Sequence, residues 1–263
     1  MGSIKHYFLT GDTHGAELLI RLFNLRQTID EGIKPSSVGI IILGDVGLNY
    51  YLDGRDKKLK KKANSFGYQI YCVRGNHEAR PKDIETMVKV YDEEVQGIVY
   101  YEPNFPNIKY FQDFGEYKIF NYKIAVIGGA YSVDKEYRLL NGWQWFCNEQ
   151  LSLQEQEEAF ALFKDEEFDL VLSHSCPYAW RPTDLFLSFI DQSKVDTTTE
   201  VYLENLKEMA FKSWGRWAFG HYHDDRLVRP GAIMLYRKII SLDEMMGDHM
   251  ALEGFVIDPK YNN

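Results

Sequence analysis

Five short hydrophobic runs of this sequence end in residues whose side chains bind metal ions. Asp12 and His14 follow the first run, Asp45 follows the second and Asn76 follows the third. The last two runs are followed by the histidines His174, His221 and His223. A short apolar run that stops at glycine or at a polar turn is typical of a buried strand. Ligands gather at the carboxyl ends of strands in open α/β sheets, so we expect these side chains to form one metal centre.

The spacing within two of these groups supports the same interpretation. Asp12 and His14 are two residues apart, as are His221 and His223. Residues i and i+2 of a strand point to the same face of the sheet. We therefore expect both members of each pair to reach the metal centre and Tyr222 to point away from it.

The sequence around these residues resembles the calcineurin-like metallophosphoesterase superfamily. The family motifs GDxHG, GDxx, GNH(E/D), a later histidine and GHxH occur here in order, as Gly11–Gly15, Gly44-Asp45, Gly75–Glu78, Ser173-His174 and Gly220–His223. The resemblance implies an α/β fold in which two sheets pack face to face and are flanked by helices. It also implies a single domain over residues 1–263, with the metals at one edge of the sheets.

The resemblance assigns each candidate ligand to one of two divalent metal ions. Asp45 would bridge the ions, and the remaining ligands would complete one site (Asp12, His14, His223) and the other (Asn76, His174, His221). This mixed ligand set favours transition metals over calcium. Manganese is the expected metal, with iron, zinc or nickel as alternatives. Two such ions, about 3.5–4 Å apart, would hold the hydroxide that attacks phosphorus.

Other residues are expected to act on the substrate. Besides Asp45, the candidate catalytic residue is His77, which faces substrate in the family and would protonate the leaving group. Arg74 and Asn76 are expected to bind phosphate oxygens, because a guanidinium binds two such oxygens at once. The alternative for Arg74 is a surface arginine at a strand edge.

The sequence departs from the protein serine/threonine phosphatase branch of the family. That branch continues its second motif as GDxVDRG, whereas Leu48 and Asn49 stand at the positions of its second aspartate and its arginine. The carboxylate that orients the catalytic histidine and one phosphate clamp are therefore missing. Arg181 is a candidate replacement clamp, and Trp180 would stack on a base or aromatic group unless it packs within its loop. The GHxH ending is similar to the broader group that includes phosphodiesterases and nucleases.

The predicted function is hydrolysis of a phosphoester substrate, with a phosphomonoester slightly favoured. The alternative is a phosphodiesterase or nuclease that acts on nucleotides or nucleic acid. A non-catalytic metal-binding scaffold is a further alternative, but the presence of His77 and of every ligand position argues against it.

Composition restricts the partners and the location. The formal charge of −9, from 30 basic and 39 acidic residues, disfavours a long nucleic acid, which normally requires a basic surface. No apolar stretch approaches the ~20 residues that span a bilayer, so we expect no membrane contact. Three widely spaced cysteines and an N-terminus that enters a strand directly favour the cytoplasm. The oligomeric state is left open.

The periodicity of apolar residues predicts the elements that position these side chains. Strands 4–10, 38–43 and 68–73 with helices 16–28 and 57–64 indicate parallel pairing through right-handed crossovers. Ser152 and Glu155 form a predicted capping box for a helix over residues 152–163. The other expected elements are a helix over 198–211 and strands at 109–111, 117–121, 123–127, 168–172, 226–228, 233–236 and 238–241.

Overall fold

The computed structural model describes residues 3–247 and 256–257 of the chain. The expected single domain over residues 1–263 also includes residues 1–2, 248–255 and 258–263, which lie outside the described residues. In the described part, no helix combines the length and apolarity needed to cross a membrane.

The first sheet holds the strands that carry the first three motifs. Its central strands β1, β2, β3 and β6 are parallel, and β13, β5 and β4 pair in the antiparallel sense at its two edges. Across the sheet the described strands follow the order β13 (Ile239–Ser241), β1 (His6–Thr10), β2 (Val38–Leu43), β3 (Gln69–Val73), β6 (Ile108–Phe111), β5 (Gly97–Tyr101), β4 (Val88–Asp92).

The second sheet carries the two histidine motifs. Strands β12, β10, β9 and β8 are parallel to one another, whereas β11 and β7 pair in the antiparallel sense. The described strands follow the order β14 (Val256–Ile257), β11 (Arg226–Arg229), β12 (Ala232–Met234), β10 (Ser213–Phe219), β9 (Glu167–Ser173), β8 (Tyr122–Ile127), β7 (Phe114–Ile119).

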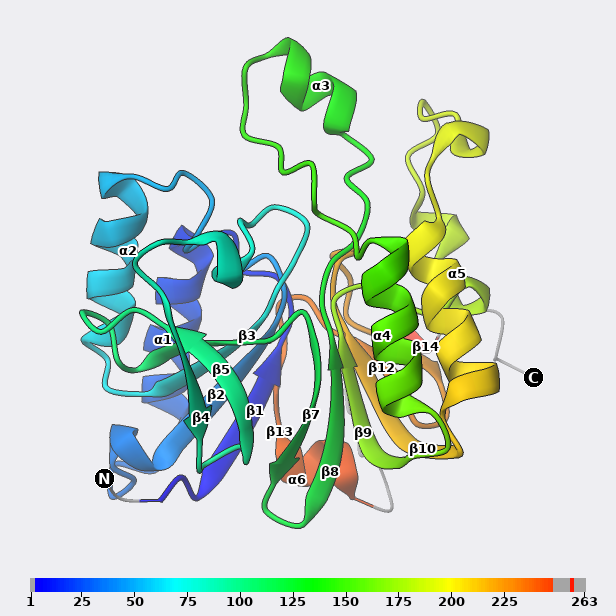
Figure 1. The fold of residues 1–263 in the computed structure, drawn as a ribbon. Helices are drawn as coiled ribbons and strands as arrows, with labels where there is room; N and C mark the ends of the chain where they lie inside the picture. The colour runs from blue at the N-terminus through cyan, green and yellow to red at the C-terminus, as the bar shows by residue number, and fades with distance from the viewer. Residues whose placement is uncertain (1–2, 248–255, 258–263) are drawn as a thin grey trace.

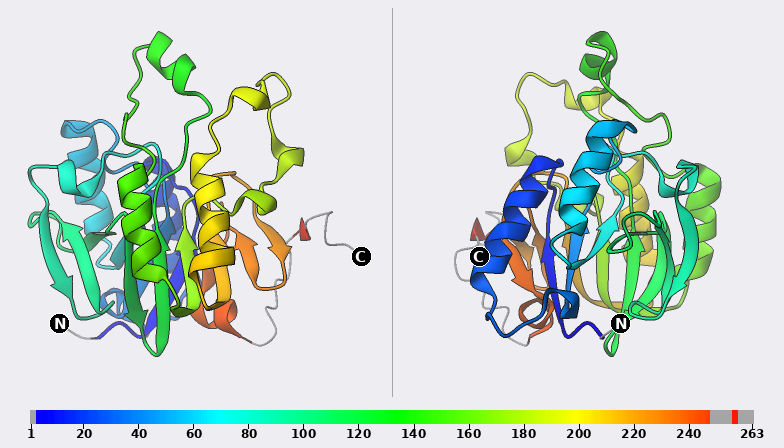
Figure 2. Two further views of the ribbon diagram at one scale, coloured as in Figure 1. Left: turned by 45° about the vertical axis from the view of Figure 1, so that its right-hand side comes forward. Right: turned by 90° about the vertical axis from the view of Figure 1, so that its left-hand side faces the viewer.

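Helices cover the outer faces of both sheets, as Figures 1 and 2 show. Helices α1 (Ala16–Thr28) and α2 (Gly54–Asn64) cover the first sheet, and α4 (Leu153–Phe163) and α5 (Thr198–Asn205) cover the second. The short helix α6 (Leu242–Met246) follows β13. The molecule is thus a two-sheet sandwich between helical layers, and the expected α/β/β/α fold is confirmed.

Strand β2 shows why the hydrophobic runs of the sequence are continuous. Ile41 and Leu43 face the second sheet in the core between the sheets, whereas Ile40 and Ile42 pack toward the helices. All six residues of the strand are buried. Because both faces of a central parallel strand are covered, polar residues do not alternate with the apolar ones.

The local predictions agree with most of these elements. Helix α1 and strand β2 have the expected bounds, and Ser152 and Glu155 form the expected capping box of α4. The expected helix over 198–211 is α5 followed by a π-helical turn at Leu206–Ala210. Strands β4 and β5 were not expected. Edge strand β4 has mostly exposed residues and therefore lacks a buried apolar pattern.

Two segments rise above the edge at which the parallel strands end (Figures 1 and 2). The first protruding segment, residues 131–148, follows β8 and contains helix α3 (Lys135–Leu140). The second protruding segment, residues 177–197, follows the neighbouring strand β9 and contains three single 3₁₀ turns. Because β8 and β9 are adjacent and parallel, both segments begin at the same edge of the second sheet.

Candidate metal centre

All seven candidate ligands lie just beyond the carboxyl ends of five strands. Strands β1, β2 and β3 of the first sheet lead to Asp12, His14, Asp45 and Asn76, and strands β9 and β10 of the second lead to His174, His221 and His223. The two sheets pack face to face with these ends at one edge. The fold therefore brings residues up to 211 positions apart in the chain to one place.

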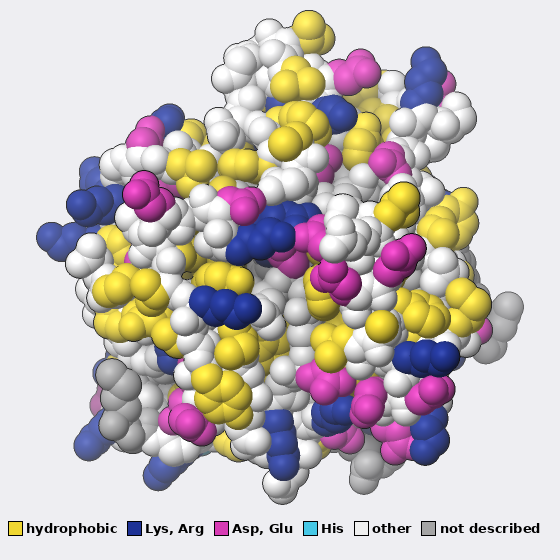
Figure 3. Space-filling model, viewed as in Figure 1, with side chains coloured by type: hydrophobic (Ala, Val, Ile, Leu, Met, Phe, Trp, Pro, Cys, Tyr) yellow, Lys and Arg dark blue, Asp and Glu magenta, His cyan; other side chains and the backbone are white. Residues whose placement is uncertain are grey.

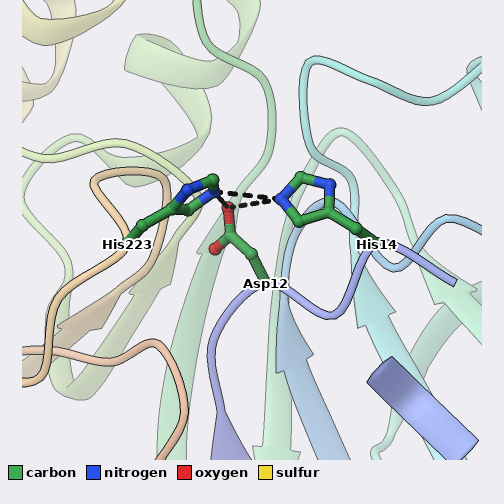
Figure 4. Close-up of side chains that lie close together, drawn as sticks. All are labelled: Asp12, His14 and His223. Atoms are coloured by element: carbon green, nitrogen blue, oxygen red, sulfur yellow. Dashed lines mark hydrogen bonds and ion pairs between the residues drawn. The ribbon is translucent and has the colours of Figure 1, made fainter. Parts of the chain in front are cut away.

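One group of ligands consists of Asp12, His14 and His223, whose side chains point toward one another in Figure 4. Their ligand atoms all lie within 4.8 Å of one another. Nε2 of His223 is 3.0 Å from Nε2 of His14 and 3.2 Å from Oδ2 of Asp12. A single Nε2–H cannot serve both neighbours, whereas a cation between the three atoms would satisfy them all.

A second group consists of Asp12, Asp45 and His174, again within 4.8 Å of one another. Nδ1 of His174 lies 2.7 Å from the carbonyl oxygen of Leu43, which requires a proton on Nδ1 and leaves the lone pair of Nε2 free for a metal. Nε2 lies 2.8 Å from Oδ1 of Asn76 and 3.8 Å from Oδ1 of Asp45. These donor atoms therefore fit a divalent ion.

Hydrogen bonds also orient Asn76 and His221, the two candidate ligands that lie beside this second group. Nδ2 of Asn76 donates to Oγ of Ser132 over 2.9 Å, which leaves Oδ1 directed at His174. The ring of His221 lies 5.0 Å from the ring of His174, between centroids, and its backbone N–H donates to Oδ1 of Asp12 over 2.9 Å. Asp12 belongs to both groups, so it links the two sets of ligands.

The expected strand alternation at GDTHG and GHYH is wrong. Strands β1 and β10 end at Thr10 and Phe219, so the ligand pairs lie in the loops that follow. The side chains converge because the backbone turns into the left-handed region, with positive φ at the ligands His14 (42°), Asp45 (45°), His221 (70°) and His223 (56°). Residues other than glycine rarely adopt this conformation, and such strain is concentrated at functional sites.

Two motif glycines are needed because ligands pack directly against them. A Cβ atom at Gly75 would lie 2.0 Å from Oδ1 of Asp45, and one at Gly220 would lie 2.3 Å from Oδ1 of Asp12. Both distances are far shorter than any allowed contact. The glycine before Asn76 and the glycine before His221 thus let one strand end approach the carboxylate of another.

The site favours ionised Asp12 and Asp45 and a neutral His221. By contrast, burial lowers the pKa of His223, but the hydrogen bond to Asp12 outweighs burial and raises it. Burial raises the pKa of Asp45, but the nearby charges of His77 and His174 outweigh it and hold the pKa below the usual range. Asp12 also has a lowered pKa, because His174 and His223 outweigh the effect of burial. Burial, with His174, lowers the pKa of His221 to about 3. Negative carboxylates and an uncharged imidazole are the forms that bind metal ions.

The expectation that Arg74 binds phosphate is wrong. Its side chain is fully buried, so it is not a surface arginine either. The guanidinium pairs with Asp113 and donates to the carbonyl oxygens of Gly75 and Glu149 over 3.0 and 2.8 Å. Arg74 therefore ties the segment after β3 to the connection between β6 and β7 and to the segment before α4, and it lines no cavity at the metal centre.

The second protruding segment places Arg181 and Trp180 differently. Arg181 lines a cavity together with His77, His221 and His223, and its guanidinium stacks on Tyr178 at 3.6 Å from the ring centroid. The structure thus brings Arg181 to the wall of the site. Trp180 is buried against Trp214 and Trp217, so the expectation that it stacks on a substrate is wrong.

Sequence reasoning missed Arg138, which approaches His77 from helix α3. Nη2 of Arg138 donates to Nε2 of His77 over 3.2 Å, and Nη1 donates to the hydroxyl of Tyr50 over 3.0 Å. Both oxygens of Asp134 accept from Nε over 2.8 Å. The i, i+4 spacing of Asp134 and Arg138 is visible in the sequence, but it only predicts a helical ion pair. No pattern in the sequence links it to His77.

Position 48 holds a leucine and not the aspartate that would orient His77, so other residues surround this histidine. Leu48 is buried in the core beneath the helices of the first sheet. Oδ2 of Asp45 is 3.9 Å from Nε2 of His77, and Arg138 contacts the same nitrogen. Burial lowers the pKa of His77, and Arg138 lowers it further while Asp45 opposes the change.

Glu78, the last residue of the GNHE motif, supports the loop that carries Asp45. Its carboxylate is buried and accepts hydrogen bonds from the backbone N–H of Gly47 over 3.0 Å and from the hydroxyl of Tyr110 over 2.9 Å. Burial, with the charge of Asp45, raises its pKa to about 7. The sequence identified Glu78 as part of a motif, whereas this supporting role follows only from the structure.

Comparison with known proteins identifies the family. The family model of the calcineurin-like phosphoesterases matches residues 6–225. A crystal structure of a protein of unknown function from Aquifex aeolicus is 12% identical, with a TM-score of 0.29 and coverage of 65% of this chain and 80% of that chain. A search of curated proteins finds no match. The family match covers most of the chain, including every candidate ligand, and the chain belongs to the calcineurin-like phosphoesterases, which are phosphoester hydrolases that use divalent metals.

Proposed function

We propose that this hydrolase binds two divalent metal ions and prefers phosphomonoesters. The observation that carries the proposal is the convergence of two ligand groups that share Asp12, with His77 beside Asp45. Oδ1 of Asp45 is 3.8 Å from Nε2 of His174, and Oδ2 is 3.9 Å from Nε2 of His77. Asp12 belongs to both ligand groups, and we assign the bridging role to the neighbouring Asp45. Manganese is the proposed native metal, since it suits a mixed set of carboxylate, amide and imidazole ligands.

The bound ions would supply an activated water and neutralise charge on the phosphate. The protein side chains would hold the ions in place. Asp12, Asp45 and Asn76 would hold the centre with its histidines, and the neighbouring histidines keep the two carboxylates ionised despite their burial. Every candidate ligand directly follows a strand at the shared edge of the two packed sheets. We therefore expect the centre to be preorganised before substrate binds.

His77 is the proposed proton donor for the leaving group. Its ring is only partly buried, and it lines both cavities that meet at the centre. Arg138 would turn to bind a phosphate oxygen in the adjacent cavity of about 200 Å³, which would free Nε2 of His77 from its hydrogen bond and allow it to carry the proton. The positive charge of Arg138 favours a monoester, because the phosphate of a monoester carries more negative charge than the phosphate of a diester.

A phosphodiester is the second candidate, and one observation favours it. Cavities of about 200 and 420 Å³ lie on two sides of the pair formed by Asp45 and His77. A diester has two ester groups, and each cavity would hold one of them. Arg181 lines the larger cavity and would contact the phosphate from that side.

A metal analysis combined with a substrate panel tests the proposal. The protein should be purified without chelator, reloaded with Mn²⁺ and analysed for bound metal. It should then be assayed with p-nitrophenyl phosphate, bis-p-nitrophenyl phosphate, cyclic nucleotides, single-stranded DNA and phosphopeptides. We expect two ions per chain and the highest kcat/KM with monoesters. A stoichiometry that never exceeds one contradicts the dinuclear centre, and two ions without any hydrolysis support the scaffold alternative.

A further inference from the structure

We propose that the substrate carries an uncharged apolar ester group, an alkyl or aryl alcohol, which binds in the cavity between the two protruding segments. We call this cavity the apolar cavity. The inference rests on the proposed function, because it places the phosphate at the metal centre and the alcohol beside it. It adds the chemical class of the alcohol, which the family does not specify.

The apolar cavity opens directly from the metal centre. It has a volume of about 420 Å³, and its base is formed by metal-centre residues: Asp45, Asn76, His77, His221 and His223. Its walls come from the two protruding segments and are mostly apolar: Val133, Leu185, Phe186, Leu187, Ile190 and Val195. An ester group attached to a phosphate at the centre would therefore lie against these side chains.

Several of these wall residues are exposed although they are apolar. Val133 and Leu187 are 46% and 50% exposed, and Leu185 is 38% exposed. In Figure 3, hydrophobic side chains are visible on the protruding upper part of the molecule. Contiguous apolar side chains at the mouth of a site mark a surface that binds an apolar partner. Their continuity with the metal centre identifies that partner as the ester group of the substrate.

The charges of the apolar cavity argue against a second anionic group. Asp134, Asp196 and Glu200 line it, whereas Arg181 is its positively charged residue. The Glu200 carboxyl is buried at its base, where Oε1 accepts hydrogen bonds from the hydroxyls of Ser175 and Tyr222 over 2.6 and 3.3 Å. Asp134 is paired with Arg138, and burial raises the pKa of Glu200. This leaves Asp196 as the carboxylate that a further phosphate of a nucleotide or nucleic-acid strand would approach in this cavity. The occupant is therefore an uncharged alcohol.

Hydrolysis of hexyl phosphate and of ethyl phosphate tests the inference. Their alcohols have similar leaving-group reactivity, so a difference in kcat/KM reports on contacts of the four additional methylene groups. Each buried methylene contributes up to about fourfold. We expect the Mn²⁺-loaded protein to prefer hexyl phosphate by about tenfold or more. It should also prefer hexyl phosphate over 1,6-hexanediol bisphosphate, because the second phosphate would approach Asp196.

A matched pair of variants locates the contact. Leu187→Asp changes a wall residue, and we expect it to reduce the preference for hexyl phosphate to about twofold or less. Leu139→Asp is the control, because Leu139 is similarly exposed at 54% on the first protruding segment but does not line the apolar cavity. This control should keep the wild-type preference. Both side chains are half exposed, and circular dichroism with a bound-metal measurement checks that both variants fold.

A binding measurement separates this inference from the proposed function. Calorimetric titration of the Mn²⁺-loaded protein with hexylphosphonate and ethylphosphonate requires no turnover. A hexyl preference that Leu187→Asp removes supports the inference even if neither phosphate ester is hydrolysed, a result that would contradict only the proposed function. Equal binding of the two phosphonates, no binding of either, a preference for the bisphosphate, or an equal effect of Leu139→Asp overturns the inference.

Discussion

The metal centre and the two protruding segments are built in different ways. The ligands lie on short loops at the ends of buried strands, and four of them have a left-handed backbone that the surrounding packing must hold in place. The protruding segments carry exposed apolar residues, although Trp180 of the second segment is buried against Trp217 of β10. The candidate ligands thus sit at the ends of buried strands, whereas the proposed contacts with the ester group sit on exposed segments.

Two arginines show the same contrast. Arg74 belongs to a motif segment, yet its guanidinium is buried and hydrogen-bonded to Asp113 and to the carbonyl oxygen of Glu149. Arg138 belongs to no motif, yet it contacts His77 from 61 positions away in the chain. Proximity to a motif in the sequence therefore does not decide whether a side chain reaches the substrate.

The largest expected effect is that of Asp45→Asn at the rigid centre. This change removes an anion that both proposed ions require, so we expect kcat to fall by about 10⁴-fold and bound Mn²⁺ to drop below two per chain. The loss should exceed that of any other single ligand change. Near-normal turnover at saturating Mn²⁺ would show that Asp45 is not the bridge.

His77→Ala should affect the leaving group and leave metal binding intact. With an alkyl phosphate, whose alcohol needs a proton, we expect kcat to fall by roughly 10³-fold. With p-nitrophenyl phosphate the loss should be much smaller, because p-nitrophenolate leaves without a proton. Steady-state kinetics on both substrates, with a metal analysis, checks this. Equal losses on both substrates would remove His77 from the acid role.

Arg74→Met should reduce stability and not directly affect the chemistry. The change leaves the buried carbonyl oxygens of Gly75 and Glu149 without their donor and leaves Asp113 paired with Arg80 alone. We therefore expect the free energy of unfolding to fall by about 3 kcal/mol. Urea denaturation of the metal-free protein measures the change. A stability within about 0.5 kcal/mol of wild type, which is typical of surface changes, would contradict the structural role of Arg74.

Arg138→Met should show the opposite pattern. Its side chain lies on a protruding segment, so we expect little change in the free energy of unfolding. A hydrogen bond from a charged group is worth about 1.5–3 kcal/mol, so kcat/KM should fall by roughly 10- to 100-fold. Kinetics and denaturation on the same preparation would distinguish the two arginines. If Arg138→Met destabilised the fold as much as Arg74→Met, the contrast between the two regions would fail.

The smallest expected effect concerns the buried Glu200 at the base of the apolar cavity. Burial raises its pKa, which the hydrogen bond from Ser175 only partly offsets. The folded protein therefore holds this proton more tightly than the unfolded chain, and the free energy of unfolding should fall as pH rises above the ordinary glutamate pKa of about 4.3. Glu200→Gln cannot ionise, so its stability should fall less over the same range.

Denaturation of metal-free wild type and Glu200→Gln at about pH 5 and about pH 7 measures this difference. Glu204→Gln is a suitable control, because Glu204 lies one turn further along α5, does not line the cavity, and pairs instead with Lys207. A wild-type slope that Glu200→Gln does not reduce would show that Glu200 is ionised in the folded protein.

The sequence by itself determined most of the strands, the first helix and the seven candidate ligands, but not strands β4 and β5. These features depend on local properties: continuous apolar runs, helical periodicity, and glycines that end each strand. The bounds of α1 and β2 and the capping box of α4 could be predicted because neighbouring residues in the chain decide them. The position of the ligands at strand ends followed from the same pattern.

Only the tertiary structure decided where the side chains point. The left-handed backbone at His14, Asp45, His221 and His223 is imposed by packing between the sheets, and local propensity would not select it. Burial in the core turned Trp180 away from the substrate, and the carbonyl of Glu149 on a distant segment fixed the guanidinium of Arg74. Arg138 meets His77 because the segment after β8 of the second sheet and the loop after β3 of the first sheet lie at the same edge, a contact between distant parts of the chain that no local pattern contains.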